Sequence, residues 1–289
     1  MQKILILSDS NNDVIRLEPK WEVLLAFSTE EVFDILAKEN KNQLDNDIFC
    51  IIISITDNYT MDDWYLELQD IFETYYNIPY IGIIENKSIN EDLIVKLINI
   101  GHLYNIYVNQ SELGDLHCEL EKVNNYYNKI NKIKLPKTNM KIIDKMVYCD
   151  DENVNLESFN AYFRRFVPYF GNEISIITTT KVEDTINEIW QSETSIILSD
   201  HRKPGYILQG DGLFQKIFSM KPSITRICLS ASAINSIDDM ISLIRKGKIN
   251  KIISKPFNTD EMTYLLNWGL VRYYKINNYW QYYIDNVLT

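Results

Sequence analysis

Short apolar runs alternate with longer amphipathic segments along the whole chain. The apolar runs have the length of strands and lie at 3–7, 49–55, 80–84 and 105–108 in the first half, and at 146–149, 174–178, 195–198, 226–229 and 251–253 in the second. Helix-length stretches lie between them, for example 89–100, 156–167, 183–191 and 234–246. Strand and helix in regular alternation predict βαβ units, which build a parallel sheet with helices on both faces. The pattern therefore predicts an α/β protein with doubly wound sheets.

The two halves of the chain follow the same outline. Each opens on a strand that ends in acidic or hydroxyl residues, ILILSDS in the first half and MVYCDDE in the second, and each closes on a strand and a helix. This repetition indicates the internal duplication of one domain type. The periodicity breaks at 132–141, where Pro136 stands among polar residues. We therefore expect one domain over 1–134, a linker over 135–144 and a second domain over 145–289.

The last predicted helix is unusually long. Its apolar positions recur every three or four residues from Met262 to Val287, over about four heptads. Such a stripe first predicts a helix face buried against the sheet of its own domain. Because one small domain does not cover this length, the rest of the stripe would dock on the other domain or pair with a second copy in a homodimer. Gly269 at a seam position argues against a strict coiled coil.

Composition and charge narrow the classes of function. The formal net charge of −11 argues against a broad surface for nucleic acid or anionic membrane, although a local basic patch stays compatible with it. The N-terminal apolar run, Ile4–Leu7, is too short for a signal peptide. No apolar run approaches the ~20 residues needed to span a bilayer. We expect a cytosolic protein that binds neither nucleic acid nor membrane.

Candidate chemistry lies at the strand ends of the second half, because open parallel sheets bind ligands at the carboxyl ends of their strands. The residues that follow these strands include Asp150 and Asp151, Ser199 and Asp200, Ser230, and Lys255. Any one of them alone is typical of a turn or a helix cap. Their occurrence in order, each at a strand end, predicts three carboxylates, a hydroxyl and a lysine on one rim.

Carboxylates gathered on one rim require compensating positive charge. Mg²⁺ would supply it through oxygen ligands, and Lys255 adds a second positive group. A metal and a lysine together neutralise the charge on the oxygens of a transferring phosphoryl group. Asp200, at the centre of the rim, can act as a nucleophile and carry an acyl phosphate.

Four segments of the second half together resemble the receiver domain of two-component response regulators. They are YCDDENVNLESF, ILSDHRKPG, RICLSAS and NKIISKPFNTDEM, within 145–274. The resemblance implies a flavodoxin-like, five-stranded receiver fold, duplicated here, with a long C-terminal helix. It implies Asp200 as phosphoacceptor, phosphoryl contacts from Ser230 and Lys255, and Mg²⁺ held by Asp150, Asp151, Asp200 and the main-chain carbonyl of Arg202. The phosphoryl donor would be a phosphohistidine on a histidine kinase or a phosphotransfer protein.

Three departures from the family pattern lie close to this site. Lys203 replaces the usual Met before the proline, and YILQGDG inserts residues after Gly205. Ile252 stands three residues before Lys255, where the family carries an aromatic switch residue. An aliphatic side chain cannot make the usual rotamer change with a polar tip. The phosphorylation chemistry does not need that residue, whereas the usual readout of phosphorylation does.

The first half keeps the pattern of strands and loses most of the chemistry. Asp9 supplies only part of the acidic pair. Aligned by sequence, Ser54 falls at the phosphoacceptor position, Asn109 and Gln110 fall where Lys-Pro is expected, and Asp57 is interpreted as a turn residue. Serine does not form an acyl phosphate, and Asn109 carries no positive charge. The first domain is therefore predicted to be a pseudo-receiver that makes protein contacts without phosphotransfer.

These expectations combine into a response regulator that catalyses only its own aspartyl phosphorylation and dephosphorylation, with output through protein contacts and no DNA-binding output domain. The alternative is a phosphorylation-independent adaptor built from two receiver-like domains. A phosphatase of the haloacid-dehalogenase type would need a second aspartate two residues after Asp200, where this chain has Arg202. Neither a dinucleotide-binding nor a P-loop glycine motif is present.

Overall fold

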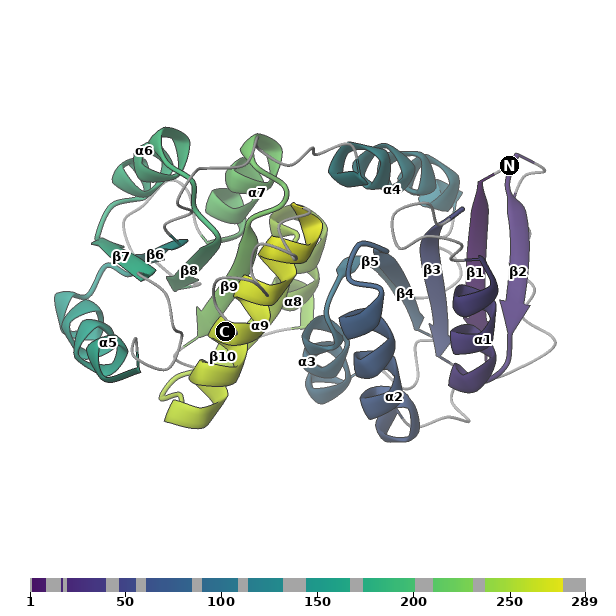
Figure 1. Ribbon diagram of the computed structural model, residues 1–289, viewed down its shortest axis with the longest axis horizontal. Helices are drawn as coiled ribbons and strands as arrows, with labels where there is room; N and C mark the ends of the chain where they lie inside the picture. The colour runs from purple at the N-terminus through teal and green to yellow at the C-terminus, as the bar shows by residue number, and fades with distance from the viewer. Residues whose placement is uncertain are drawn as a thin grey trace. The chain divides into compact units, whose positions relative to one another are not determined.

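Two compact units make up the chain, Met1–Lys132 and Ile133–Thr289, and each is built on its own five-stranded parallel sheet (Figure 1). The computed structural model describes residues 2–8, 17, 20–39, 47–55, 61–84, 90–108, 114–131, 144–166, 174–200, 210–230 and 237–277. Most of the expected linker lies outside these residues, and the first strand of the second unit already begins at Asp144.

The first unit has five strands and four helices among the described residues. They are β1 (Lys3–Ser8), β2 (Glu22–Ala26), α1 (Thr29–Glu39), β3 (Ile48–Ile55), α2 (Met61–Thr74), β4 (Tyr80–Ile84), α3 (Glu91–Ile100), β5 (Leu103–Val108) and α4 (Leu116–Asn131). The strand order is β2-β1-β3-β4-β5, and every neighbouring pair is parallel. The helices α1, α2 and α3 pack side by side, whereas α4 packs on β3.

The second unit repeats this architecture. Its elements are β6 (Asp144–Cys149), α5 (Asn153–Phe166), β7 (Ile174–Thr179), α6 (Val182–Gln191), β8 (Ile196–Asp200), α7 (Gly210–Met220), β9 (Thr225–Ser230), α8 (Ile237–Ser242) with a π-helical turn (Leu243–Gly247), β10 (Lys251–Ser254) and α9 (Thr259–Ile276). The strand order β10-β9-β8-β6-β7 is that of the first sheet, read from the opposite edge. Both sheets therefore have the flavodoxin-like, doubly wound order.

Every strand expected from the apolar runs is present, and the predicted fold class is confirmed. One further strand, β2, was not predicted. It lies at the edge of the first sheet, and most of its side chains are half-exposed. Its sequence holds a short apolar run, VLLA at 23–26, but the strand is not buried on both faces as β3 is.

One helix pair, α5 and α9, covers one face of the second sheet and forms the main core of that unit with it. The buried side chains of this core are Met146, Tyr148, Leu156, Phe159, Phe163, Ile174, Ile196, Leu198, Ile227, Leu229, Ile253, Met262, Leu265, Leu266, Leu270 and Tyr274. The apolar stripe of α9 thus faces the sheet of its own domain. The part of the predicted stripe at 278–289 lies outside the described residues, so the homodimer stays a prediction. No helix in the described ranges is long and apolar enough to cross a membrane.

Gly269 lets α9 approach the sheet closely, which explains a glycine inside this helix. A Cβ at this position would lie 2.8 Å from Cδ1 of Ile196 and 3.3 Å from Cγ2 of Thr225. The Thr225 hydroxyl donates a hydrogen bond to the Gly269 carbonyl at 2.9 Å. The glycine therefore belongs to the packing within the domain and not to a helix–helix seam.

Substituting Gly269→Ala is expected to destabilise the second domain by about 1–2 kcal/mol. Overpacking a core costs about 1–3 kcal/mol, and the better helix propensity of alanine offsets up to about 1 kcal/mol of it. Urea unfolding followed by far-UV circular dichroism measures the loss. Ile196→Val removes the clashing Cδ1, so Gly269→Ala should cost less in that background. Equal costs in both backgrounds would contradict the packing explanation.

Candidate functional site

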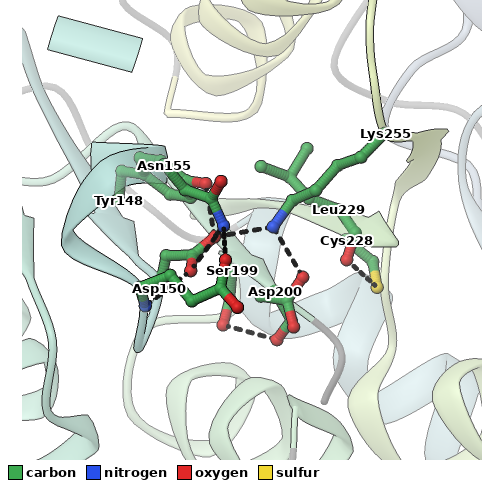
Figure 2. A network of polar contacts seen from close by, with 9 residues as sticks. Tyr148, Asp150, Asn155, Ser199, Asp200, Cys228, Leu229 and Lys255 are labelled. Carbon is green, nitrogen blue, oxygen red and sulfur yellow. Dashed lines mark hydrogen bonds and ion pairs between the residues drawn. The ribbon is translucent and has the colours of Figure 1, made fainter. Parts of the chain in front are cut away.

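The polar strand ends of the second sheet meet at one rim, as the sequence pattern predicts. Asp150 directly follows β6, Asp200 is the last residue of β8, Ser230 is the last residue of β9, and Lys255 directly follows β10. In the strand order, β6 and β9 flank β8, and β10 lies beside β9. The carboxyl ends of these parallel strands therefore bring residues 105 positions apart into contact (Figure 2).

Lys255 bridges two carboxylates at the centre of this rim. Its Nζ donates to Oδ2 of Asp150 at 2.6 Å and to Oδ1 of Asp200 at 2.7 Å, as Figure 2 shows. The Asp150 side chain is only 1% exposed, and those of Asp200 and Lys255 are 11% and 13% exposed. The backbone N–H of Lys255 also donates to the Ser230 carbonyl, which fixes the start of the lysine side chain against β9. The lysine thus supplies positive charge that compensates these two carboxylates.

Asp150 has three further hydrogen-bond donors besides Lys255. The Tyr148 hydroxyl donates to Oδ2 at 2.6 Å, and the backbone N–H of Glu152 donates to Oδ1 at 3.0 Å. Nδ2 of Asn155, in the first turn of α5, lies 3.1 Å from Oδ1 and 3.2 Å from Oδ2. Sequence reasoning did not find Tyr148 or Asn155. The available signal was a tyrosine two residues before Asp150, on the same face of the strand.

The ionisation of the site follows from burial and these contacts. Burial is the largest influence on Asp150 and acts to raise its pKa, but the hydrogen bonds from Lys255, Tyr148, Glu152 and Asn155 together lower the pKa below its usual value. Burial likewise acts to lower the pKa of Lys255, and the bonds to both aspartates outweigh it and raise the pKa. Burial, with the bond to Asp150, raises the pKa of Tyr148, so its hydroxyl keeps its proton. The site therefore holds an ionised Asp150 and a protonated Lys255 at neutral pH.

The other predicted site residues are placed as follows. The side chain of Ser230 is buried at the end of β9, and Asp151 is half-buried directly after Asp150. The hydroxyl of Ser199, beside Asp200 on β8, donates to the Asp200 carbonyl at 3.1 Å. Arg202, Lys203 and the first part of the insertion, 206–209, lie outside the described residues, whereas its last residues, 210–212, form the start of α7. Ile252, at the position of the family's aromatic switch, is buried on β10.

Three solved structures with similar folds each match less than half of this chain. The signal receiver domain of an HD domain-containing protein from Pseudomonas fluorescens Pf-5 has 18% identity and a TM-score of 0.42, over 49% of this chain and 96% of that one. A response regulator receiver domain protein (CheY-like) from Methanospirillum hungatei JF-1 has 16% identity and a TM-score of 0.40, over 46% and 98%. A response regulator receiver domain protein from Clostridium thermocellum has 16% identity and a TM-score of 0.39, over 45% and 96%.

The likeness is to receiver domains. No family model and no curated protein matches the sequence. At these identities the likeness concerns the fold alone.

The oxygen donors at this rim of the second sheet suit a hard divalent cation. Carboxylates such as those of Asp151 and Asp200 are the ligands that Mg²⁺ prefers. Asp150 already accepts bonds from four donors, so it would reach a metal by exchanging one of them or through a water. The expected carbonyl donor, Arg202, is not among the described residues, and within those residues no three Asp, Glu, His or Cys side chains are arranged to hold a metal ion. The donor chemistry fits Mg²⁺.

The first sheet carries no carboxylate at the position of Asp200. The strand registers pair Ser8 with Ser54 in the first sheet and Cys149 with Ser199 in the second, at the last residues of β1 and β6. Ser54 is therefore the counterpart of Ser199, and Ile55 is the counterpart of Asp200. The expectation that Ser54 holds the phosphoacceptor position is wrong by one residue. The cause is that sequence alignment of a long apolar strand does not fix its register against the neighbouring strand.

The strands β4 and β5 of the first sheet show the same shift of one residue against the sequence alignment. The registers pair Ile83 with Tyr107 in the first sheet, and Cys228 with Ile252 in the second. Asn109 and Gln110, expected at the place of Lys-Pro, lie outside the described residues. Neither side chain carries a charge. Tyr107 is the counterpart of Ile252, so the aromatic residue stands in the first sheet and not in the second.

Proposed function

We propose that this protein is a response regulator whose second domain takes up a phosphoryl group on Asp200 from a phosphohistidine of a histidine kinase or a phosphotransfer protein. The observation that carries the proposal is the buried lysine between two carboxylates at the carboxyl ends of parallel strands. Such a site offers a nucleophilic oxygen beside a fixed cation, which is what phosphoryl transfer needs.

In the proposed step a carboxylate oxygen of Asp200 attacks the phosphorus. The bond from phosphorus to the histidine nitrogen breaks, and its electron pair stays on the imidazole, which leaves with the donor. Lys255 lies 2.7 Å from Oδ1 of Asp200, close enough to bond an oxygen of the transferred group. The hydroxyl of Ser230, on the next strand, would bond a second oxygen. The product is an acyl phosphate, which water later hydrolyses.

Mg²⁺ is the cofactor that we propose for this site. Asp150, Asp151, Asp200 and the main-chain carbonyl of Arg202 would hold it, and when bound it would neutralise the charge on the phosphoryl oxygens. Lys255 alone supplies one positive charge, whereas the rim carries three acidic residues. A divalent cation would therefore leave the site close to neutral before the dianionic group enters.

The first domain is part of the same proposal as a pseudo-receiver that makes protein contacts. Ile55, the counterpart of Asp200, has no nucleophilic atom, which supports a role without phosphotransfer. Output would pass through protein contacts, without turnover of a separate substrate. We place the protein in the cytosol, away from membranes and nucleic acid, in line with its net charge of −11.

A second candidate, a phosphorylation-independent adaptor, is favoured by one observation. Ile252 is buried and aliphatic, so the aromatic rotamer change that reports phosphorylation in receivers has no counterpart at this position. The two candidates differ in what they bind. A phosphoacceptor site binds Mg²⁺ and a phosphoryl analogue, whereas an adaptor needs neither.

Beryllofluoride, which mimics an aspartyl phosphate, tests the proposal directly. With millimolar Mg²⁺ we expect the full chain to bind a single equivalent, detected by ¹⁹F NMR, and to lose it when the Mg²⁺ is chelated. Absence of binding would favour the adaptor, and steady turnover of a phosphate ester would favour an enzyme.

Light scattering on the same samples measures whether two copies of the chain associate, as the proposed homodimer through the C-terminal helix predicts.

A further inference from the structure

Tyr148 is a buried tyrosine whose hydroxyl points into the proposed site. It lies on β6, two residues before Asp150, and is 1% exposed. Its hydroxyl donates to Oδ2 of Asp150 at 2.6 Å, the same oxygen that accepts from Lys255 (Figure 2). The proposed phosphoryl transfer assigns no role to this hydroxyl. A phenylalanine would fill the same volume in the core but would lack the hydroxyl.

The ring of Tyr148 is held in place by aromatic neighbours from elements that border the site. Its centroid lies 4.7 Å from that of Phe159 on α5. Phe159 in turn lies 6.4 Å from Phe257, two residues after Lys255, in an edge-on contact. A ring fixed by packing on one side presents its hydroxyl at a fixed point on the other. The position of Asp150 is therefore set from the core and not only from the loop that follows β6.

The contacts of Asp150 show what the hydroxyl does. Each carboxylate oxygen has room for about two strong hydrogen bonds, and the two short bonds of Oδ2 come from Tyr148 and Lys255, beside a longer 3.2 Å contact from Asn155. With Oδ2 filled in this way, Asp150 would hold a cation through a water and not by direct contact. Lys255 can then divide its bonds between Asp150 and Asp200, at 2.6 and 2.7 Å.

We propose that Tyr148 is a positioning residue of the Asp200 site, whose hydroxyl occupies Asp150 and so keeps Lys255 and an incoming cation available to Asp200. The inference rests on the proposed function and adds a residue to it. Without the hydroxyl, Oδ2 of Asp150 loses one of its two short hydrogen bonds and keeps Lys255 with the longer 3.2 Å contact from Asn155. That oxygen then binds the cation directly and holds Lys255 more tightly. Both effects draw positive charge away from the oxygens that react at Asp200.

The test compares Tyr148→Phe with the wild-type chain in two measurements, Mg²⁺ binding by calorimetry and the rate of modification by acetyl phosphate at saturating Mg²⁺. In the modification, Asp200 attacks phosphorus and acetate leaves with the electrons of the bond to phosphorus. We expect the Mg²⁺ dissociation constant to fall about threefold to tenfold and the saturated rate to fall by a similar factor, which is the net size of one typical hydrogen bond. Tyr162→Phe is the matched control. It removes a hydroxyl that bonds the Thr259 carbonyl, from a ring that also contacts Phe159.

If Tyr148 had only a structural role, Tyr148→Phe would change stability. It would not tighten Mg²⁺ binding while also slowing the modification by acetyl phosphate. Unchanged or weaker Mg²⁺ binding in a folded Tyr148→Phe chain would overturn the inference. If that variant does not fold, Asn155→Ala, which removes another donor from Asp150, must tighten Mg²⁺ binding for the inference to stand. A wild-type chain that binds no Mg²⁺ would instead refute the proposed function, so the two failures are distinguishable.

Discussion

Replacing Asp200 with asparagine is expected to abolish phosphoryl uptake by the chain. An amide has no anionic oxygen to attack phosphorus, and no other described carboxylate both contacts Lys255 and ends a strand of the sheet. Labelling from acetyl phosphate should fall to background, a loss of at least about a hundredfold for a missing nucleophile. Intact-mass spectrometry measures the adduct, and its loss on treatment with hydroxylamine identifies it as an acyl phosphate.

Asp57→Asn is the matched control for this experiment. Asp57 is the acidic residue that follows the third strand of the first half, and it was interpreted as a turn residue. Labelling should survive that substitution, because Ile55 occupies the position of Asp200 in the first sheet. Equal labelling of Asp200→Asn and wild type would place the acceptor elsewhere. Loss of labelling in Asp57→Asn alone would move it to the first domain.

The sequence predicts the fold well because the signal that it reads is local. A strand buried on both faces, such as β3 or β8, needs an unbroken apolar run, and such a run is visible in the sequence. The strand ends then follow, so Asp150, Asp200 and Lys255 could be placed on one rim without a structure. The edge strand β2 was not predicted, although its sequence holds a short apolar run, VLLA at 23–26.

The parts of the site that the sequence does not predict depend on contacts between strands. Ser54 and Ile55 are equally compatible with the end of an apolar strand, and only the pairing with β1 decides between them. In the sequence, Tyr148 looks like any other buried residue of β6. Only the 2.6 Å hydrogen bond from its hydroxyl to Asp150 shows that it has a polar role. The stripe on α9 likewise shows that one face is buried, but not that Gly269 lies against Ile196.

Replacing Lys255 with methionine is expected to remove phosphoryl transfer and also to destabilise the second domain. The substitution leaves two buried carboxylates on one rim without their cation. Removing one partner of a buried ion pair costs about 3–5 kcal/mol. We expect about 2–4 kcal/mol here because Asp150 keeps its bonds from Tyr148 and Asn155. Hydrogen exchange of β8 and β10 in the full chain, with a chelator present, measures the loss within this domain.

Lys246→Met is the control for loss of a lysine as such. Lys246 lies on the π-helical turn, its side chain is 62% exposed, and it lies 3.8 Å from Asp211. Exposed pairs of this kind contribute about 0–1 kcal/mol. A comparable loss in both lysine variants would mean that the Lys255 bridge contributes no more than a surface charge.

The pH dependence of stability distinguishes loss of the Lys255 ion pairs from loss of the packing of its side chain. In the wild type, the raised pKa of Lys255 stabilises the fold below the ordinary value of 10.5 and loses this effect as the pH rises through the folded-state value. The lowered pKa of Asp150 stabilises the fold above the ordinary value of 3.8 and loses this effect as the pH falls through the folded-state value. Wild-type stability from these two groups is therefore level near neutral pH.

In Lys255→Met the pH dependence of the stability that the carboxylates contribute has the opposite sign. Two acidic groups that are buried together without a cation have folded-state pKa values above their unfolded ones, so the folded chain binds more protons. Its stability should therefore rise as the pH falls from 7 towards 5, and the gap to wild type should narrow. Millimolar Mg²⁺ should narrow the gap at pH 7 for the same reason, since it restores positive charge between Asp150 and Asp200. A gap that depends on neither pH nor Mg²⁺ would show that Lys255 acts through packing of its methylenes and not through its charge.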